Sequence, residues 1–117
     1  MTGIRTVARK FIYSFKGIVH AAIKDTGFRA QLIVGIPGLL LVWYFGKPLS
    51  EIDMILITLA TLLVLITELQ NSAFESALDH LHPEMHHNIG HSKDMAAGAV
   101  LLSAVFALIV AIVIVWF

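Results

Sequence analysis

Five polar side chains are spaced to share one face of the segment 68–79, which directly follows an apolar run. They are Glu68, Asn71, Ser72, Glu75 and Asp79. At the periodicity of an α-helix they fall within an arc of about 100°. Each ionised group at membrane depth costs at least ~2.5 kcal/mol on insertion scales, so packing alone explains this stripe poorly. The stripe therefore predicts a functional site.

The residue types of the stripe suit a magnesium ion and a general base. Carboxylate and amide oxygens are ligands that Mg²⁺ prefers, with waters and phosphates as the others. Glu75 is the best ligand candidate, whereas Glu68 lies about 10 Å deeper along the helix axis and could deprotonate a lipid hydroxyl. Lys93 and Asp94 open the next apolar segment at the same level, and Lys93 near a helix N-terminus is a candidate phosphate contact.

Composition predicts that these groups belong to a membrane protein. The 117 residues are 58% hydrophobic and 14% charged, whereas soluble domains carry about 25% charged residues. Soluble enzymes and regulators are therefore excluded. Eight basic residues balance eight acidic ones, so no nucleic acid partner is indicated. Cysteine is absent, which excludes disulfides, thiolate zinc sites and cysteine nucleophiles.

Three apolar runs predict three transmembrane helices, at 30–45, 54–67 and 95–117. The third run has 23 residues without a charge and is long enough to cross a hydrocarbon core of about 30 Å. The first two need flanking residues. The second can be completed only by continuing through the polar stripe, which forces polar groups into the membrane.

The N-terminal residues 4–23 predict a helix that lies on the membrane surface. Apolar residues recur at three- and four-residue spacing, and cations occupy the other face, as in helices that bind anionic lipid. Six of the eight Lys and Arg residues precede the first apolar run at 30–45, which predicts a cytoplasmic N-terminus and an external C-terminus. Ser50 and Asp53 are spaced as a capping box for the second span. Gly90 and Ser92 are candidate stop and start signals between the second and third spans.

The sequence thus predicts an all-α, single-domain membrane protein. Its expected segments are a surface helix (1–26), a first span (27–46), a second span with a cytoplasmic extension (52–80), a cytoplasmic loop (81–92) and a third span (93–117).

Five histidines between residues 80 and 91 raise the alternative of a zinc site. His82 and His86 are four residues apart, but Pro83 disturbs any helix between them, and no cysteine assists. We therefore favour magnesium over zinc.

Two motifs resemble the signature of the bacterial membrane diacylglycerol kinase family, which includes the undecaprenol kinases. They are Glu68-Leu-Gln-Asn-Ser-Ala-Phe-Glu-Ser-Ala-Leu-Asp79 and, fourteen residues later, Lys93-Asp94-Met-Ala-Ala-Gly-Ala-Val. The run Tyr13-Ser-Phe-Lys-Gly17, continuing through Asp25 to Phe28-Arg29, is similar to the same family. The resemblance implies a homotrimer in the bacterial cytoplasmic membrane, with active sites shared between neighbours. It also implies transfer of the γ-phosphate of magnesium ATP to a lipid hydroxyl.

The resemblance assigns roles position by position. Glu68 matches the catalytic base and Asn71 the polar residue beside it. Asp25 and Glu75 match metal ligands, although the family usually has the longer Glu where Asp25 stands. The positions that match the nucleotide site are Arg9, Tyr13, Asp25, Glu75, Asp79, Glu84, His86, Lys93 and Asp94. For the lipid substrate we expect contacts from Glu68 and Ala97.

Three classes of function follow. The favoured one is a diacylglycerol kinase that makes phosphatidic acid, with an undecaprenol kinase using the same site as the alternative. A small cation-coupled transporter could use Glu68 as its intramembrane carboxylate, but a transport path should place polar groups on both sides of the midplane, and the outer halves of the predicted spans are bare. A non-catalytic adaptor would leave the carboxylate stripe without a purpose.

Overall fold

The computed structural model describes residues 2–45, 48–84 and 86–117, and most of these residues lie in α-helices. Its helices are α1 (Thr2–Lys24), α2 (Thr26–Phe45), α3 (Glu51–Leu81) and α4 (His87–Trp116). Three of them, α2, α3 and α4, are long and apolar enough to cross a membrane. The prediction of an all-α membrane protein with an amphipathic first helix and three candidate spans is confirmed.

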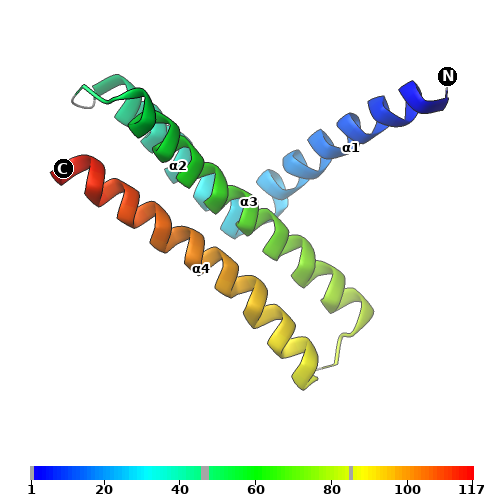
Figure 1. Cartoon of the computed structure of the whole chain (residues 1–117). Coiled ribbons are helices and arrows are strands. Elements are labelled where there is room, and N and C mark those ends of the chain that lie inside the picture. Colours follow the sequence, from blue (N-terminus) through cyan, green and yellow to red (C-terminus); the bar gives the residue numbers. More distant parts are fainter. Residues whose placement is uncertain (1, 46–47, 85) are drawn as a thin grey trace.

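Helix α3 is the central element, because it packs against each of the other three helices. Figure 1 shows α2 alongside the first half of α3, α4 running back along it, and α1 projecting away from the bundle. The end of α1 and the start of α2 meet α3 near its middle (Figure 1). The junction between α1 and α2 therefore faces the segment of α3 that carries the polar stripe.

Two small apolar cores hold this arrangement together. The first joins Ala21, Phe28 and Leu65, and thus fixes the junction of α1 and α2 against α3. Phe28 is only 3% exposed, and burying such a side chain is worth about 1.5–3 kcal/mol. The second core joins Ala60, in the first part of α3, to Val110 and Ile114, in the last part of α4.

The start of α3 has the predicted capping box. The Asp53 N–H donates to Ser50 Oγ (3.1 Å), and the Ser50 N–H donates to Asp53 Oδ2 (3.4 Å). From there α3 continues to Leu81 without a break, so one helix carries both the second apolar run and the polar stripe. The helix ends just before Pro83, because the residue preceding a proline disfavours helical geometry.

The start of α4 differs from the prediction. The helix begins at His87, so residues 87–92, which we expected in the loop, are helical, and Gly90 and Ser92 are not stop and start signals. The cause is His86, whose Nδ1 accepts a hydrogen bond from the Asn88 N–H (3.2 Å) and caps the first turn. Lys93 consequently lies in the second turn of α4 rather than at its N-terminus.

The capping box gives a test of the fold. We expect Ser50→Ala to lower the free energy of unfolding by about 1 kcal/mol, because the Asp53 N–H loses its acceptor. Unfolding by dodecyl sulfate in mixed micelles measures this change. Thr58→Ala is the matched control, since the Thr58 hydroxyl bonds only a carbonyl of its own helix, that of Met54. An equal loss of stability in both variants would contradict the cap.

Candidate active site

Asp25 is the hinge between α1 and α2. Its N–H donates to the Ala21 carbonyl (2.8 Å) and completes α1, while its own carbonyl accepts from the Arg29 N–H (3.0 Å) in α2. Its side-chain Oδ2 accepts from the Phe28 N–H (2.8 Å), which makes Asp25 the N-cap of α2. Arg29 also donates to the Ile23 carbonyl (3.1 Å) at the end of α1. The change of chain direction is thus fixed by local hydrogen bonds.

A hydrogen bond from α3 ties this hinge to the polar stripe. The Ser72 hydroxyl donates to Asp25 Oδ2 (2.8 Å), and the pair is partly buried. Oδ2 therefore accepts from two donors at once, one in α2 and one in α3. This bond brings together a stripe residue and a candidate metal ligand that lie 47 positions apart.

Glu68 lies against the first turn of α2. A Cβ added to Gly27 would overlap Glu68 Oε1, and it would lie 3.3 Å from Glu68 Cδ and 3.8 Å from Asp25 Oδ2. The two carboxylates therefore converge on the backbone of Gly27. The N-terminal amide groups of a helix carry positive potential, which makes this a favourable place for negative charge.

Glu75 completes an electrostatic cluster with these two residues. Asp25 and Glu75 are the carboxylates whose negative charges act on Glu68. Within residues 2–45, 48–84 and 86–117, however, no three His, Cys, Asp or Glu side chains are grouped closely enough to hold a metal ion. A magnesium ion would need further ligands from phosphate or water, which is its usual mode of binding.

A cleft of about 940 Å³ opens between α1 and α3 beside Asp25. Its polar lining comes from both helices and includes Tyr13, Lys24 and Asp25 on one side and Ser72, Ser76 and His80 on the other. The Lys16 ammonium lies 5.9 Å from the centre of the Tyr13 ring. Cationic and hydroxyl groups thus line a cleft beside Asp25, one candidate metal ligand. Such a lining suits a polyphosphate.

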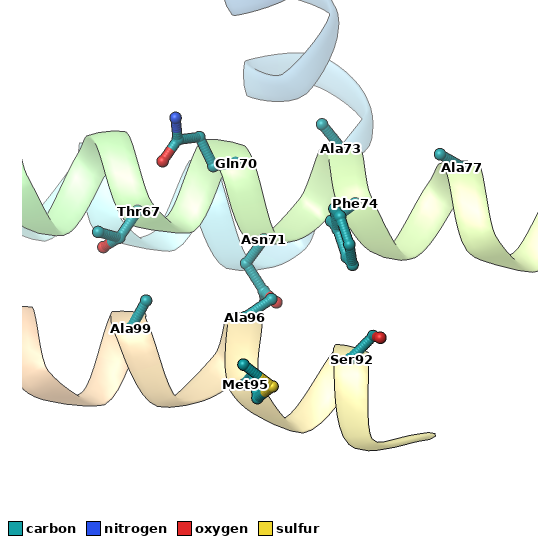
Figure 2. Close-up of a pocket in the computed structure, with 10 residues that line it drawn as sticks. All are labelled: Thr67, Gln70, Asn71, Ala73, Phe74, Ala77, Ser92, Met95, Ala96 and Ala99. Atoms are coloured by element: carbon teal, nitrogen blue, oxygen red, sulfur yellow. The ribbon is translucent and has the colours of Figure 1, made fainter. Parts of the chain in front are cut away.

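A second, more apolar groove of about 650 Å³ lies between α3 and α4. Its lining residues are Thr67, Gln70, Asn71, Ala73, Phe74, Ala77, Ser92, Met95, Ala96 and Ala99. Figure 2 shows Asn71 pointing from α3 toward Ala96 of α4. Asn71 Oδ1 is buried and has no hydrogen-bond partner in the described chain. The structure therefore directs Asn71 toward α4, whereas Glu68 faces α2.

The remaining predicted nucleotide residues lie near the end of α3, near the start of α4 or on α1. Lys93 and Asp79 form an ion pair between the two helices. Lys93 is 31% and Asp79 63% exposed, and such exposed pairs contribute only about 0–1 kcal/mol. The pair is thus available to exchange partners. The other members, all exposed, are Arg9 on α1, Glu84 and His86 between α3 and α4, and Asp94 on α4. Ala97, the predicted lipid contact, is an exposed residue of α4.

Some residues of the site were not predicted from the sequence. The contact of Gly27 with Glu68 depends on tertiary packing and has no local signal. The capping role of Asp25 does have a local sequence signal, because Asp directly before a helical segment is a preferred N-cap. His20, Lys24 and His80 reach the cleft only because α1 crosses α3 at this point.

Comparison with known proteins identifies the family. A family model described as prokaryotic diacylglycerol kinase matches residues 12–115. The chain belongs to the prokaryotic diacylglycerol kinase family. It is 29% identical over 115 residues to the diacylglycerol kinase of Escherichia coli K12, which covers 98% of this chain and 93% of the relative. It is 30% identical over 102 residues to that of Haemophilus influenzae, covering 87% and 85% of the two chains. It is 34% identical over 101 residues to that of Synechocystis, covering 86% and 57%.

Membership confirms the resemblance and identifies the chain as a kinase, with ATP as its expected co-substrate. The transporter and the adaptor are thereby set aside. A kinase site should contain a proton acceptor, an oxygen-rich metal site and a space for the nucleotide. The junction of α1, α2 and α3 offers a candidate for each of them: Glu68 for the proton acceptor, Asp25 and Glu75 for carboxylate ligands, and the cleft for the nucleotide.

The close approach of Glu68 to Gly27 gives a test. We expect Gly27→Val to lower kinase turnover by about 10- to 100-fold, because the new side chain displaces the Glu68 carboxylate. Gly38→Val is the matched control, since it lies on the same helix with open space around it. Phosphate transfer from labelled ATP measures turnover. Equal activity of the two variants would show that the position of Glu68 against α2 is unimportant.

Proposed function

We propose that this chain is a diacylglycerol kinase that transfers the γ-phosphate of magnesium ATP to the hydroxyl of diacylglycerol and forms phosphatidic acid. The observation that carries the proposal is the convergence of Glu68 and Asp25 at Gly27, beside a cleft large enough for a nucleotide. The names of the relatives, each a diacylglycerol kinase, favour this acceptor over undecaprenol.

In this proposal Glu68 is the general base. It accepts the proton of the lipid hydroxyl while the hydroxyl oxygen forms a bond to the γ-phosphorus. The bond from the γ-phosphorus to the bridging oxygen breaks, and ADP leaves with that oxygen. Glu68 precedes Glu75 by seven residues, about 10 Å along α3, so the base lies on the lipid side of the metal ligands. This order suits an acceptor that comes from the membrane and a donor that comes from water.

Asp25 and Glu75 would hold the magnesium ion. The fit rests on their chemistry, because both offer carboxylate oxygens, and one or two carboxylates with phosphate oxygens are the usual protein site for Mg²⁺. Bound there, the ion would neutralise charge on the phosphates during transfer. Tyr13 lines the cleft, and Arg9 lies one helical turn before it on α1. In the proposed site both contact the nucleotide.

Lys93, Asp79 and Asp94 would contact the nucleotide from the other side, together with Glu84 and His86. The exposed ion pair of Lys93 and Asp79 is weak enough for a phosphate to compete for the lysine. Asn71 would assist Glu68, and Ala97 would contact the lipid. Asn71 faces α4, Lys93 reaches Asp79 from α4, and Glu68 faces α2, so a complete site requires groups from more than one side of α3.

We further propose that the active form is a homotrimer in the bacterial cytoplasmic membrane, with a cytoplasmic N-terminus and an external C-terminus. The excess of Lys and Arg before the first span supports this orientation. The open groove between α3 and α4, lined by alanines at membrane depth, supports close approach of another helix. Sites shared between neighbouring copies would add metal ligands to those of one chain, whose described residues show no group of three potential ligands.

The test is phosphate transfer from labelled ATP with magnesium to diacylglycerol and to undecaprenol, side by side, by purified protein in mixed micelles. We expect faster labelling of diacylglycerol. Faster labelling of undecaprenol would contradict the proposed acceptor and assign the chain to carrier-lipid supply. Labelling of neither lipid by folded protein would contradict lipid kinase activity.

Loss of a metal ligand should change the magnesium dependence. We expect Glu75→Gln to raise the magnesium concentration for half-maximal transfer by about a hundredfold, because a neutral amide replaces a charged ligand. Glu51→Gln is the control, since Glu51 is an exposed residue at the other end of the same helix. An unchanged magnesium dependence in Glu75→Gln would exclude Glu75 as a ligand.

A further inference from the structure

We propose that Ser72 is a positioning residue of the metal site, which orients Asp25 and sets its distance from Glu75. The inference deepens the proposed function, because it rests on Asp25 and Glu75 being the magnesium ligands. Ser72 itself touches neither metal nor nucleotide in this proposal.

The first observation is how the two oxygens of Asp25 are used. Oδ2 accepts from the Phe28 N–H and from the Ser72 hydroxyl, both at 2.8 Å. In the part of the chain that the structure describes, no donor is paired with Oδ1. The two bonds therefore fix the rotation of the carboxylate and keep Oδ1 free for a cation.

The second observation is the helix from which Ser72 reaches Asp25. Ser72 lies three residues before Glu75 on α3, and residues at this spacing are neighbours on one helix face. Asp25 belongs to the junction of α1 and α2. The Phe28 bond fixes Asp25 only within that junction. The hydrogen bond from Ser72 joins Asp25, one proposed metal ligand, to α3, the helix that carries the other, Glu75.

The third observation is the length of residue 25. Asp is a preferred N-cap because its short side chain reaches the amide groups of the first helical turn. Here that capping position brings Oδ2 within reach of Ser72. The hydroxyl thus gives a shorter carboxylate a fixed place at the edge of the cleft, which Asp25 and Ser72 both line.

Groups that orient a metal ligand without touching the metal have a measurable effect on metal affinity. We expect Ser72→Ala to raise the Mn²⁺ concentration for half-occupancy by about tenfold, because the Asp25 carboxylate gains rotational freedom. Mn²⁺ is the probe, with a non-hydrolysable ATP analogue, and electron paramagnetic resonance of the purified full chain in micelles measures its binding.

Thr61→Ala is the matched control. Thr61 lies on the same helix three turns before Ser72, and its partly buried hydroxyl donates to the Ile57 carbonyl (2.9 Å), so this variant loses one hydroxyl of α3 away from the cleft. We expect this variant to bind Mn²⁺ like the unaltered chain. Ser72→Thr keeps a hydroxyl and should restore binding. In the kinase assay, Ser72→Ala should require more magnesium and reach an unchanged kcat at saturation.

The outcomes separate the two proposals. Mn²⁺ binding that weakens in Ser72→Ala alone, in a chain that phosphorylates no lipid, would support the positioning role and contradict the proposed function. Unchanged Mn²⁺ affinity in Ser72→Ala, or equal weakening in Thr61→Ala, would overturn the inference. Loss of thermal stability in Ser72→Ala without any change in Mn²⁺ affinity would mean that the bond only holds α3 against the hinge, which also overturns it. Absence of Mn²⁺ binding by the unaltered chain would also overturn the inference.

Discussion

The hydrogen bonds of Asp25 are the interaction on which the rest of the site depends. This residue completes α1, caps α2 and accepts a hydroxyl from α3, so three helices are fixed relative to one another at one side chain. A small apolar core of Ala21, Phe28 and Leu65 lies at the same junction. Directional bonds set the geometry there, and apolar burial supplies much of the stabilising free energy.

At this junction the carboxylates of Asp25 and Glu68 find polar partners, which lowers the free-energy cost of placing them at membrane depth. An ionised group in the hydrocarbon core is unfavourable unless it has partners. Glu68 lies beside the amide groups that begin α2, and Asp25 receives two hydrogen bonds. Asn71 has a buried oxygen without a partner in the described chain, and Glu75 adds negative charge close to Glu68. The polar groups of the cluster are thus only partly paired within the described residues, which agrees with the proposal that the site binds a cation and substrates.

Much of this could be predicted from the sequence. The three apolar runs, the amphipathic first helix and the continuation of α3 through its polar stripe follow from periodicity and length, and the capping box at Ser50 follows from spacing. The family also followed from two motifs. The start of α4 was misjudged, because glycine and serine are weak boundary signals and the actual cap is a histidine side chain.

The convergence of Glu68 with Gly27 and of Ser72 with Asp25 could not be predicted. Residues from separate segments meet there only through packing of α1 and α2 on α3, and sequence periodicity specifies the face of a helix but not its partner. The resemblance supplied roles for Asp25 and Glu75, but not the hydrogen bonds that orient them.

We propose that Glu68 is the proton acceptor in a site whose nucleotide is held by other residues. The most direct test of this proposal is Glu68→Gln, with phosphate transfer to diacylglycerol and binding of magnesium nucleotide measured on the same preparation. We expect transfer to fall by about 10²- to 10⁴-fold, the contribution of a general base, while nucleotide affinity stays unchanged. Near-normal transfer by this variant, or a loss of nucleotide binding as large as the loss of transfer, would contradict the assignment.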